Sequence, residues 1–358
     1  MEPNELYGRL REHLNNFLMG MPHEPTLMQM LKVMFPLDEA EIALKIPMAD
    51  TKLSELEQQF PEVDNLEEIL MRMVDRGTVF WNQAPGKEKV YRLMTGVGGW
   101  AETPFWGGRD TPQAREMAPL YKNMKTLAYS KALAEGAPLV RVIPVMESLE
   151  DSSAVLPYDE LIPKIEATKF RAVAHCPCRH AANLRGEGCD HTVDNCLHFG
   201  TFARFMVEQD IAREISVEET IDILKAARSE GLVHVANNMD GHLESICNCC
   251  TCGDCYWLNT AKDINRDVLM ESNYVAKADE DTCTLCGECE ERCPMEAIEV
   301  DGHDCAEVDA KLCIGCGVCT ICDEEAIKLV PRETIKTPPN LMEWASQRME
   351  AFKQRKSE

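Results

Sequence analysis

Cysteine crowding is the feature that most constrains this chain. All 18 cysteines lie between residues 176 and 322 of a chain of 358 residues, and most stand one to three residues from the next. Disulfide frameworks belong to short secreted chains, whereas closely spaced thiols converge on one centre and bind metal. The first 20 residues carry Glu2, Glu5 and Glu12 and no apolar leader. We therefore expect metal or iron–sulfur sites, and no secretory signal.

The remaining composition is that of a globular protein. Apolar residues make up 45% and charged residues 27% of the chain, which excludes wholesale disorder. The formal net charge is −24, so the surface repels phosphate backbones and anionic lipid and favours basic protein partners. A membrane span needs about 18 apolar residues, and the best run, residues 137–146, is interrupted by Arg141 and Pro144. We expect no nucleic-acid partner and no membrane insertion.

The first 100 residues contain no cysteine. Apolar spacing predicts helices over 26–35, 38–44, 51–60 and from 66 to a stop at Gly77, followed by a β-hairpin with strands at 79–81 and 90–93. This order resembles a winged helix-turn-helix, whose third helix would enter the DNA major groove. That helix contains Glu55 and Glu57, so a docking or dimerisation module is favoured over nucleic-acid binding.

Two related cysteine motifs follow each other near the C-terminus. Each has three cysteines separated by two residues and a fourth further on: Cys283, Cys286, Cys289 and Cys293, then Cys313, Cys316, Cys319 and Cys322. Three thiolates at this spacing suit three irons of one [4Fe–4S] cubane, and Pro294 turns the fourth thiolate toward a neighbouring cluster. Zinc is the weaker alternative, because zinc sites use two CxxC pairs at wider spacing.

Residues 275–332 resemble a bacterial-type two-[4Fe–4S] ferredoxin domain. The resemblance implies that Cys322 completes the first cluster and Cys293 the second. The second copy is one residue tighter than the first, and Asp323 stands where the first copy has proline. The odd Cys305, between the copies, is expected to be a small buried apolar residue rather than a ligand.

Nine further cysteines form two groups upstream. Their members are Cys176, Cys178, Cys189 and Cys196, and then Cys247, Cys249, Cys250, Cys252 and Cys255. The second group exceeds what one tetrahedral site needs, which suits a [4Fe–4S] cluster with a spare thiol; zinc or a reactive thiol pair is the alternative. The first group lies near His191 and His198, so zinc with mixed ligands stands beside the cluster interpretation. Arg179 is expected to offset cluster charge and donate to sulfur.

The order of these motifs over residues 170–332 is similar to that in a widespread group of uncharacterised multi-cluster ferredoxin-domain proteins of anaerobic microbes. This resemblance implies [4Fe–4S] clusters outside the ferredoxin domain, and the number of cysteines allows up to four clusters in all. The predicted fold class is α+β: a winged-helix-like domain (1–100), a mixed α/β domain with cysteine-rich loops (101–270), a two-cluster ferredoxin domain (271–332) and a C-terminal helix (333–358). Within the middle domain we expect a strand over 139–145 and a helix over 162–173. The tail helix is expected to end in solvent, with a docking arm as the alternative.

Absent motifs narrow the function. The chain has no GxGxxG after a strand, no P-loop and no nucleophile elbow, so we assign no catalytic residue. The favoured hypothesis is an electron-transfer protein or subunit that relays single electrons to a redox partner with a basic patch, in the cytoplasm of an anaerobe. The alternatives are a reductase with an open-site cluster in the 176–255 region and a redox-sensing transcription regulator. The sequence leaves open whether the chain is a homo-oligomer or a subunit of a complex.

Overall fold

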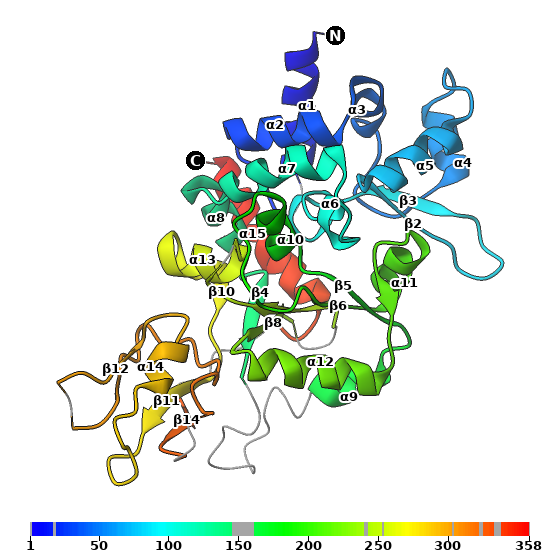
Figure 1. Ribbon diagram of the computed structural model, residues 1–358. Coiled ribbons are helices and arrows are strands. Elements are labelled where there is room, and N and C mark those ends of the chain that lie inside the picture. Colours follow the sequence, from blue (N-terminus) through cyan, green and yellow to red (C-terminus); the bar gives the residue numbers. More distant parts are fainter. Residues whose placement is uncertain are drawn as a thin grey trace.

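The computed structural model describes residues 2–16, 19–144, 161–239, 243–252, 254–302, 304–321, 325–332 and 338–357. Cys322, Asp323 and the expected end of a strand at Val145 lie outside the described residues. Figure 1 shows a large body and a smaller lobe, which contains β11, β12, β14 and α14. The lobe corresponds to the doubled cysteine motif, and the body carries the two upstream cysteine groups.

Five helices and a three-stranded antiparallel sheet form the N-terminal part of the body. The helices are α1 (Pro3–Asn15), α2 (Pro25–Met34), α3 (Leu37–Ala43), α4 (Leu53–Gln59) and α5 (Leu66–Arg76), and the sheet has the order β1 (Thr51–Lys52), β3 (Val90–Leu93), β2 (Val79–Asn82). The expected helices and hairpin are present, except that Thr51 and Lys52 are extended because they pair with β3. Gly77 ends α5 with φ +82°, a conformation that suits glycine.

Three helices connect this region to the rest of the body. They are α6 (Thr103–Trp106), α7 (Pro112–Asn123) and α8 (Leu127–Ala134). Trp100 is buried and meets the edge of Phe35 with ring centroids 6.0 Å apart. One hydrophobic core runs from α1 through α7 into the cysteine-rich region, so the N-terminal helices pack directly on the elements that carry the thiols.

A seven-stranded sheet organises the middle of the body. Its order is β10 (Leu269–Met270), β4 (Val140–Ile143), β8 (Val233–Asn237), β9 (Ser245–Cys249), β6 (Asp194–Phe199), β5 (Arg171–His175), β7 (Arg213–Glu214). All neighbours are antiparallel except β10 and β4. The associated helices are α9 (Leu161–Ala167), α10 (Pro177–Leu184), α11 (Gly200–Glu208), α12 (Val217–Ser229) and α13 (Tyr256–Asp263). In Figure 1, α9 and α12 lie on one side of the sheet and α10 on the other.

The helix expected over residues 162–173 was partly wrong. The helix α9 ends at Ala167, and Arg171–His175 form the strand β5. The Thr168 hydroxyl donates to the Lys164 carbonyl at 2.7 Å. A side chain thus donates to one of the last backbone carbonyls of α9. The following residues pair with β6 from Arg171 to His175, so sheet pairing overrides the local preference.

The lobe is built from two short antiparallel pairs and one helix. The strand β11 (Tyr274–Ala278) pairs with β14 (Ile327–Pro331), β12 (Ile298–Glu299) pairs with β13 (Glu307–Val308), and α14 spans Glu288–Arg292. Arg292 Nη2 donates to the carbonyls of Arg228 at 3.4 Å and Ser229 at 3.2 Å, at the end of α12. These hydrogen bonds join the lobe to the body.

After the lobe, the chain returns to the body as α15 (Leu341–Ser357). Trp344 and Arg348 are 6% and 2% exposed, so the expectation of a solvated tail was wrong for this part of the helix. Arg348 donates to three carbonyls: Nη1 to Leu133 at 2.9 Å and Ala137 at 2.8 Å, and Nη2 to Ala132 at 3.2 Å. The carbonyls at the end of α8 therefore hold the tail helix.

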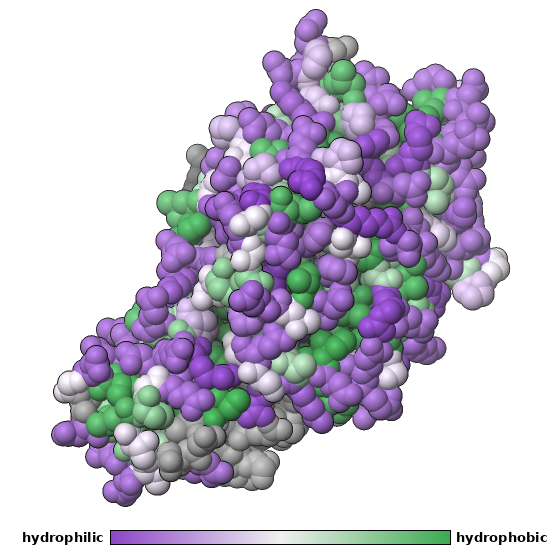
Figure 2. Space-filling view, viewed as in Figure 1, coloured by the Kyte–Doolittle hydropathy of each residue, from purple (hydrophilic) through white to green (hydrophobic). Residues whose placement is uncertain are grey.

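Polar residues cover most of the face shown in Figure 2. Within the described ranges, no helix is long and apolar enough to cross a membrane.

Replacing Arg348 should destabilise the body. We expect Arg348→Ala to lower the free energy of unfolding by about 3 kcal/mol, since it removes charge-assisted hydrogen bonds and leaves buried carbonyls unpaired. Anaerobic urea denaturation measures the change. Glu350→Ala, at an exposed position of the same helix, is the control, and equal stabilities of the two variants would contradict the role of Arg348.

Candidate metal centres

Seven cysteines of the lobe line two cavities. Cys283, Cys286 and Cys289 line one, and Cys293, Cys313, Cys316 and Cys319 line the other. Cys293 thus lies with the three thiols of the second motif, which is the grouping that the ferredoxin resemblance implies. The fourth cysteine of the second motif, Cys322, is outside the described residues, and its role as a ligand stays a prediction.

Backbone amides point at several of these sulfurs. Ala297 N–H donates to Cys293 Sγ at 3.2 Å, and Ala276 N–H donates to Cys313 Sγ at 3.5 Å. Such donors stabilise thiolates and tune iron–sulfur centres. Gly315, with φ +66°, lies so close to Tyr274 that an added Cβ would stand 2.1 Å from its carbonyl oxygen. The second cysteine loop therefore needs glycine at this position.

The donor set of the lobe fits bound iron. Burial raises the pKa of Cys316 to about 12 and that of Cys319 well above its usual value. A thiol in such a place ionises readily only beside a bound cation. Cys305 stands apart: it is half-buried beside Cys283 and does not line either cavity.

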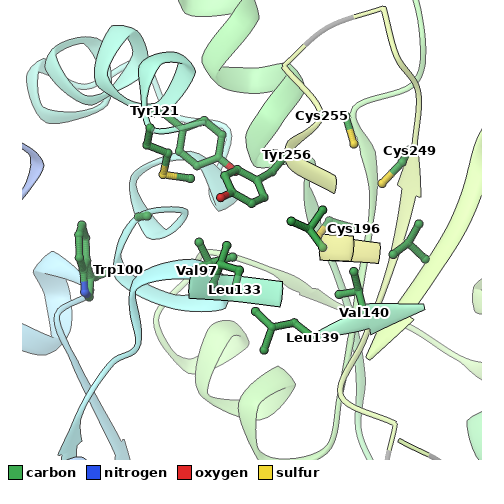
Figure 3. Close-up of a cluster of buried hydrophobic side chains, with 14 of the residues drawn as sticks. Val97, Trp100, Tyr121, Leu133, Leu139, Val140, Cys196, Cys249, Cys255 and Tyr256 are labelled. Carbon is green, nitrogen blue, oxygen red and sulfur yellow. The ribbon is translucent and has the colours of Figure 1, made fainter. Parts of the chain in front are cut away.

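The body contains a larger cavity, of about 100 Å³, with sulfur on its walls. Its seven cysteines are Cys176, Cys178, Cys196, Cys247, Cys249, Cys250 and Cys255. We call it the body cavity. Figure 3 shows Cys196, Cys249 and Cys255 gathered beside Val140 and Tyr256. Every cysteine in the described part of the chain is free, so these thiols are available to a metal centre.

Strand pairing brings these distant cysteines together. Cys247 and Cys249 stand two apart on β9, and alternate residues of a strand face the same side. The strand β6 pairs with β9 and also with β5, which places Cys196 opposite Ala174 and close to Cys176 at the end of β5. Cys176 is the N-cap residue of α10 and Cys255 that of α13, so two helix N-termini also meet at the cavity.

A second group lies at the edge of the body cavity. The sulfurs of Cys189, Cys250 and Cys252 are within 4.8 Å of one another, and Cys189 and Cys250 are 4.0 Å apart. We call these residues the edge group. In the described ranges it is the only such group of three metal-binding side chains, and it contains no histidine. His191 instead faces Glu230, with Nδ1 3.4 Å from Oε2.

The structure thus divides the nine upstream cysteines differently from their order in the chain. Cys189, a member of the first sequence group, lies in the structure with Cys250 and Cys252 of the second group. The other three members of the first group line the body cavity together with most of the second. Spacing alone contains no signal for this grouping, because Cys189 and Cys250 are 61 residues apart in the chain.

Arg179 lies between the two groups. Its side chain is 2% exposed, and Nη2 donates to Cys250 Sγ at 3.6 Å. Further donations to Asn195 Oδ1 at 3.0 Å and the Asn248 carbonyl at 2.9 Å fix the guanidinium. A buried cation beside several thiols offsets the charge of thiolates or of an anionic cluster. The sequence expectation that Arg179 donates to sulfur agrees with this contact.

Three other side chains meet the sulfurs. Trp257 donates a hydrogen bond to Cys247, Tyr121 Oη lies 3.4 Å from Cys178 Sγ, and His198 Nε2 lies 3.2 Å from Cys196 Sγ. Burial lowers the pKa of His198 to about 4, which keeps its ring neutral. Tyr121 and Trp257 were not predicted from the sequence. Trp257 follows Cys255 by two residues, whereas nothing in the sequence connects Tyr121 with a cysteine 57 residues away.

A buried carboxyl completes the lining. Glu102 is 5% exposed, and the Gly99 N–H donates to its Oε2 at 3.1 Å. Burial raises the pKa of Glu102 to about 8. The carboxyl is therefore mostly protonated at neutral pH and adds no full negative charge to the thiols.

Comparison with known protein families assigns one segment of the chain to a family. Residues 276–299 match the model of the 4Fe-4S binding domain family. The chain therefore contains a ferredoxin-type 4Fe–4S domain in the lobe, which supports at least one [4Fe–4S] cluster and an iron–sulfur electron-transfer role. No solved structure matches the chain.

The pKa of Glu102 predicts a pH-dependent stability. An unfolded carboxyl ionises near pH 4.5 and the folded one near pH 8, so the folded state binds more protons between these values and loses stability as the pH rises. Relative to Glu102→Gln, the native protein should lose about 2 to 3 kcal/mol between pH 5 and pH 7. Anaerobic unfolding of both proteins at both pH values measures this, with Glu57→Gln, at an exposed position, as the control. A pH-independent difference would show that Glu102 ionises normally.

Proposed function

We propose that this chain is an iron–sulfur electron-transfer protein that relays single electrons through up to four [4Fe–4S] clusters. The observation that carries the proposal is the serial arrangement of the thiols. The two lobe cavities, the edge group and the body cavity follow one another, and each is joined to the next by described residues. Such clusters supply one-electron chemistry, and the protein sets their positions and potentials.

The first lobe cavity is the end nearest to solvent. Cys286 is exposed, whereas Cys313, Cys316 and Cys319 of the second cavity are buried. Leu285 and Leu312 are each 43% exposed beside the two cysteine loops. Large apolar side chains exposed beside a redox site suit contact with a partner protein.

The second lobe cavity faces the body through Arg292. This residue directly precedes Cys293, and its Nε donates to the Val318 carbonyl at 3.3 Å. Its Nη2 reaches the end of α12. There Ala227 and Leu232 pack with Cys250, and Cys189 packs against this cluster. The edge group is therefore the part of the body's thiol set that lies next to the lobe contact, and Arg179 connects it to the body cavity.

The proposed partner is a redox protein with a basic patch. Residues 271–332 contain sixteen acidic and five basic residues, so the lobe concentrates the negative charge of the chain around its clusters. Opposite charge steers docking and raises association rates. Because thiol-bound clusters need a reducing compartment, we place the protein in the cytoplasm of an anaerobe.

A reductase remains the second candidate, since the edge group has three thiols within the described chain. A centre held by three protein ligands leaves a position for another ligand. The regulator hypothesis is weaker, because α4 contains Glu55 and Glu57 and no basic residue, and an acidic helix is a poor partner for phosphates.

Iron and acid-labile sulfide per chain test the proposal. Anaerobically purified protein should contain about sixteen irons for four cubanes, whereas about eight would restrict clusters to the lobe. Cys316→Ala should lose about four irons, and Cys305→Ala, a cysteine of the same lobe outside both cavities, should lose none. Zinc retained in place of iron would reassign the edge group, and iron-free native protein would overturn the proposal.

Salt should slow electron transfer to a basic acceptor. With a basic cytochrome c as probe, we expect the association rate to fall about tenfold or more as the Debye length shrinks from about 30 Å at 0.01 M to about 3 Å at 1 M salt. Stopped-flow absorbance of the dithionite-reduced protein measures the rate. Ferricyanide, an anion, is the control and should show the opposite trend. A rate indifferent to salt would argue against steering by the acidic lobe.

A further inference from the structure

A second, wider pocket adjoins the body cavity. Its volume is about 440 Å³, within the range of small-molecule sites. Six residues line both spaces: Val97, Gly98, Val140, His198, Ser245 and Trp257. We call it the side pocket. It lies outside the thiol groups and has no role in the relay proposed above.

The walls of the side pocket are mostly aromatic and apolar. Four aromatic side chains line it: Phe80, Phe202, Trp257 and Trp344. Met19, Met94 and Met239 add flexible, polarisable surface, which adapts well to flat ligands. Aromatic rings bind one another in stacked or edge-on geometry, so this lining favours an aromatic ligand.

The charged groups of the side pocket do not favour an ionic ligand. The positively charged residue in the lining is Arg92. Its Nη1 pairs with Asp50 Oδ1 at 2.8 Å, and its guanidinium lies 3.8 Å from the centroid of the Phe80 ring. Glu244 supplies a carboxylate at the exposed side of the pocket. An anion is repelled by Glu244 and competes with Asp50 for Arg92, and a cation is repelled by Arg92. A neutral molecule meets neither cost.

The tail helix α15 closes one wall. Leu341, Trp344 and Ala345 line the pocket, and Arg348, one turn further on, holds the helix on α8. Leu341 is 51% exposed, so it stands at the rim, whereas Trp344 is buried in the wall. The pocket is thus a formed space with an opening toward solvent, and not a packing defect within the core.

We propose that the side pocket binds a neutral aromatic molecule of one or two rings beside the body cavity. Trp257 contributes its ring to the pocket and its indole N–H to Cys247, so an occupant contacts a residue that also contacts a thiol of the cavity. This assigns a ligand-binding site to the body in addition to its metal centres. Binding needs no electron transfer, so the site can be tested separately from the relay.

Isothermal titration calorimetry of the oxidised holoprotein with 2-naphthol tests the site. We expect one molecule bound per chain, and affinity at least tenfold weaker for the anion 2-naphthalenesulfonate. Ala345→Phe, which fills the pocket from α15, should weaken 2-naphthol binding at least tenfold. Ser346→Phe, at the adjacent exposed position, should leave it unchanged, and the visible absorption of the clusters should be retained in both variants.

A second variant tests the site in case Ala345→Phe does not fold. Leu341→Trp narrows the rim at a half-exposed position and should also weaken binding. Absence of saturable 2-naphthol binding, equal affinities for Ala345→Phe and Ser346→Phe, or tighter binding of the sulfonate would overturn the proposal. None of these outcomes bears on the iron content, by which the relay is judged.

Discussion

Burial of many thiols in an acidic chain requires compensating positive charge, and the body and the lobe are organised around that requirement. Desolvation raises the pKa of buried thiols such as Cys316, so a thiolate set is stable only with a cation beside it. Iron would supply most of that charge. Arg179, the backbone amides at Cys293 and Cys313, and the indole of Trp257 supply the remainder as fixed hydrogen-bond donors. The protonated Glu102 avoids adding an anion to the same space.

This organisation explains why the sequence predicts the lobe better than the body. In the lobe, ligands three residues apart wrap one centre, so local spacing contains most of the information, and the family match covers residues 276–299 of that lobe. In the body, the partners come from β6, β9, the residue after β9 and two helix N-termini. Cys189 could not be separated from Cys196 by spacing, because Cys196 lies on β6 whereas Cys189 precedes that strand, and only the folded chain brings Cys189 to Cys250 and Cys252.

The same contrast holds for the helices. Amphipathic spacing and a glycine stop predicted α5 well, since its apolar face and its C-terminal Gly77 are local features. The helix expected at 162–173 was partly wrong because β6 recruits Arg171–His175 into the sheet. The tail was misjudged for a similar reason: the carbonyls that hold Arg348 belong to residues more than 200 positions earlier. The winged-helix character of the first 100 residues and the domain boundaries remain predictions.

The return of α15 to the body has a consequence for how the protein is made. The lobe lies in the chain between the seven-stranded sheet and α15, and Arg292 adds hydrogen bonds between the lobe and the body. During translation, α15 also follows every cysteine of the sequence. The wall that α15 contributes to the side pocket is therefore synthesised after all the thiols, so the side pocket stays open on that side during the interval when a nascent chain could receive its iron.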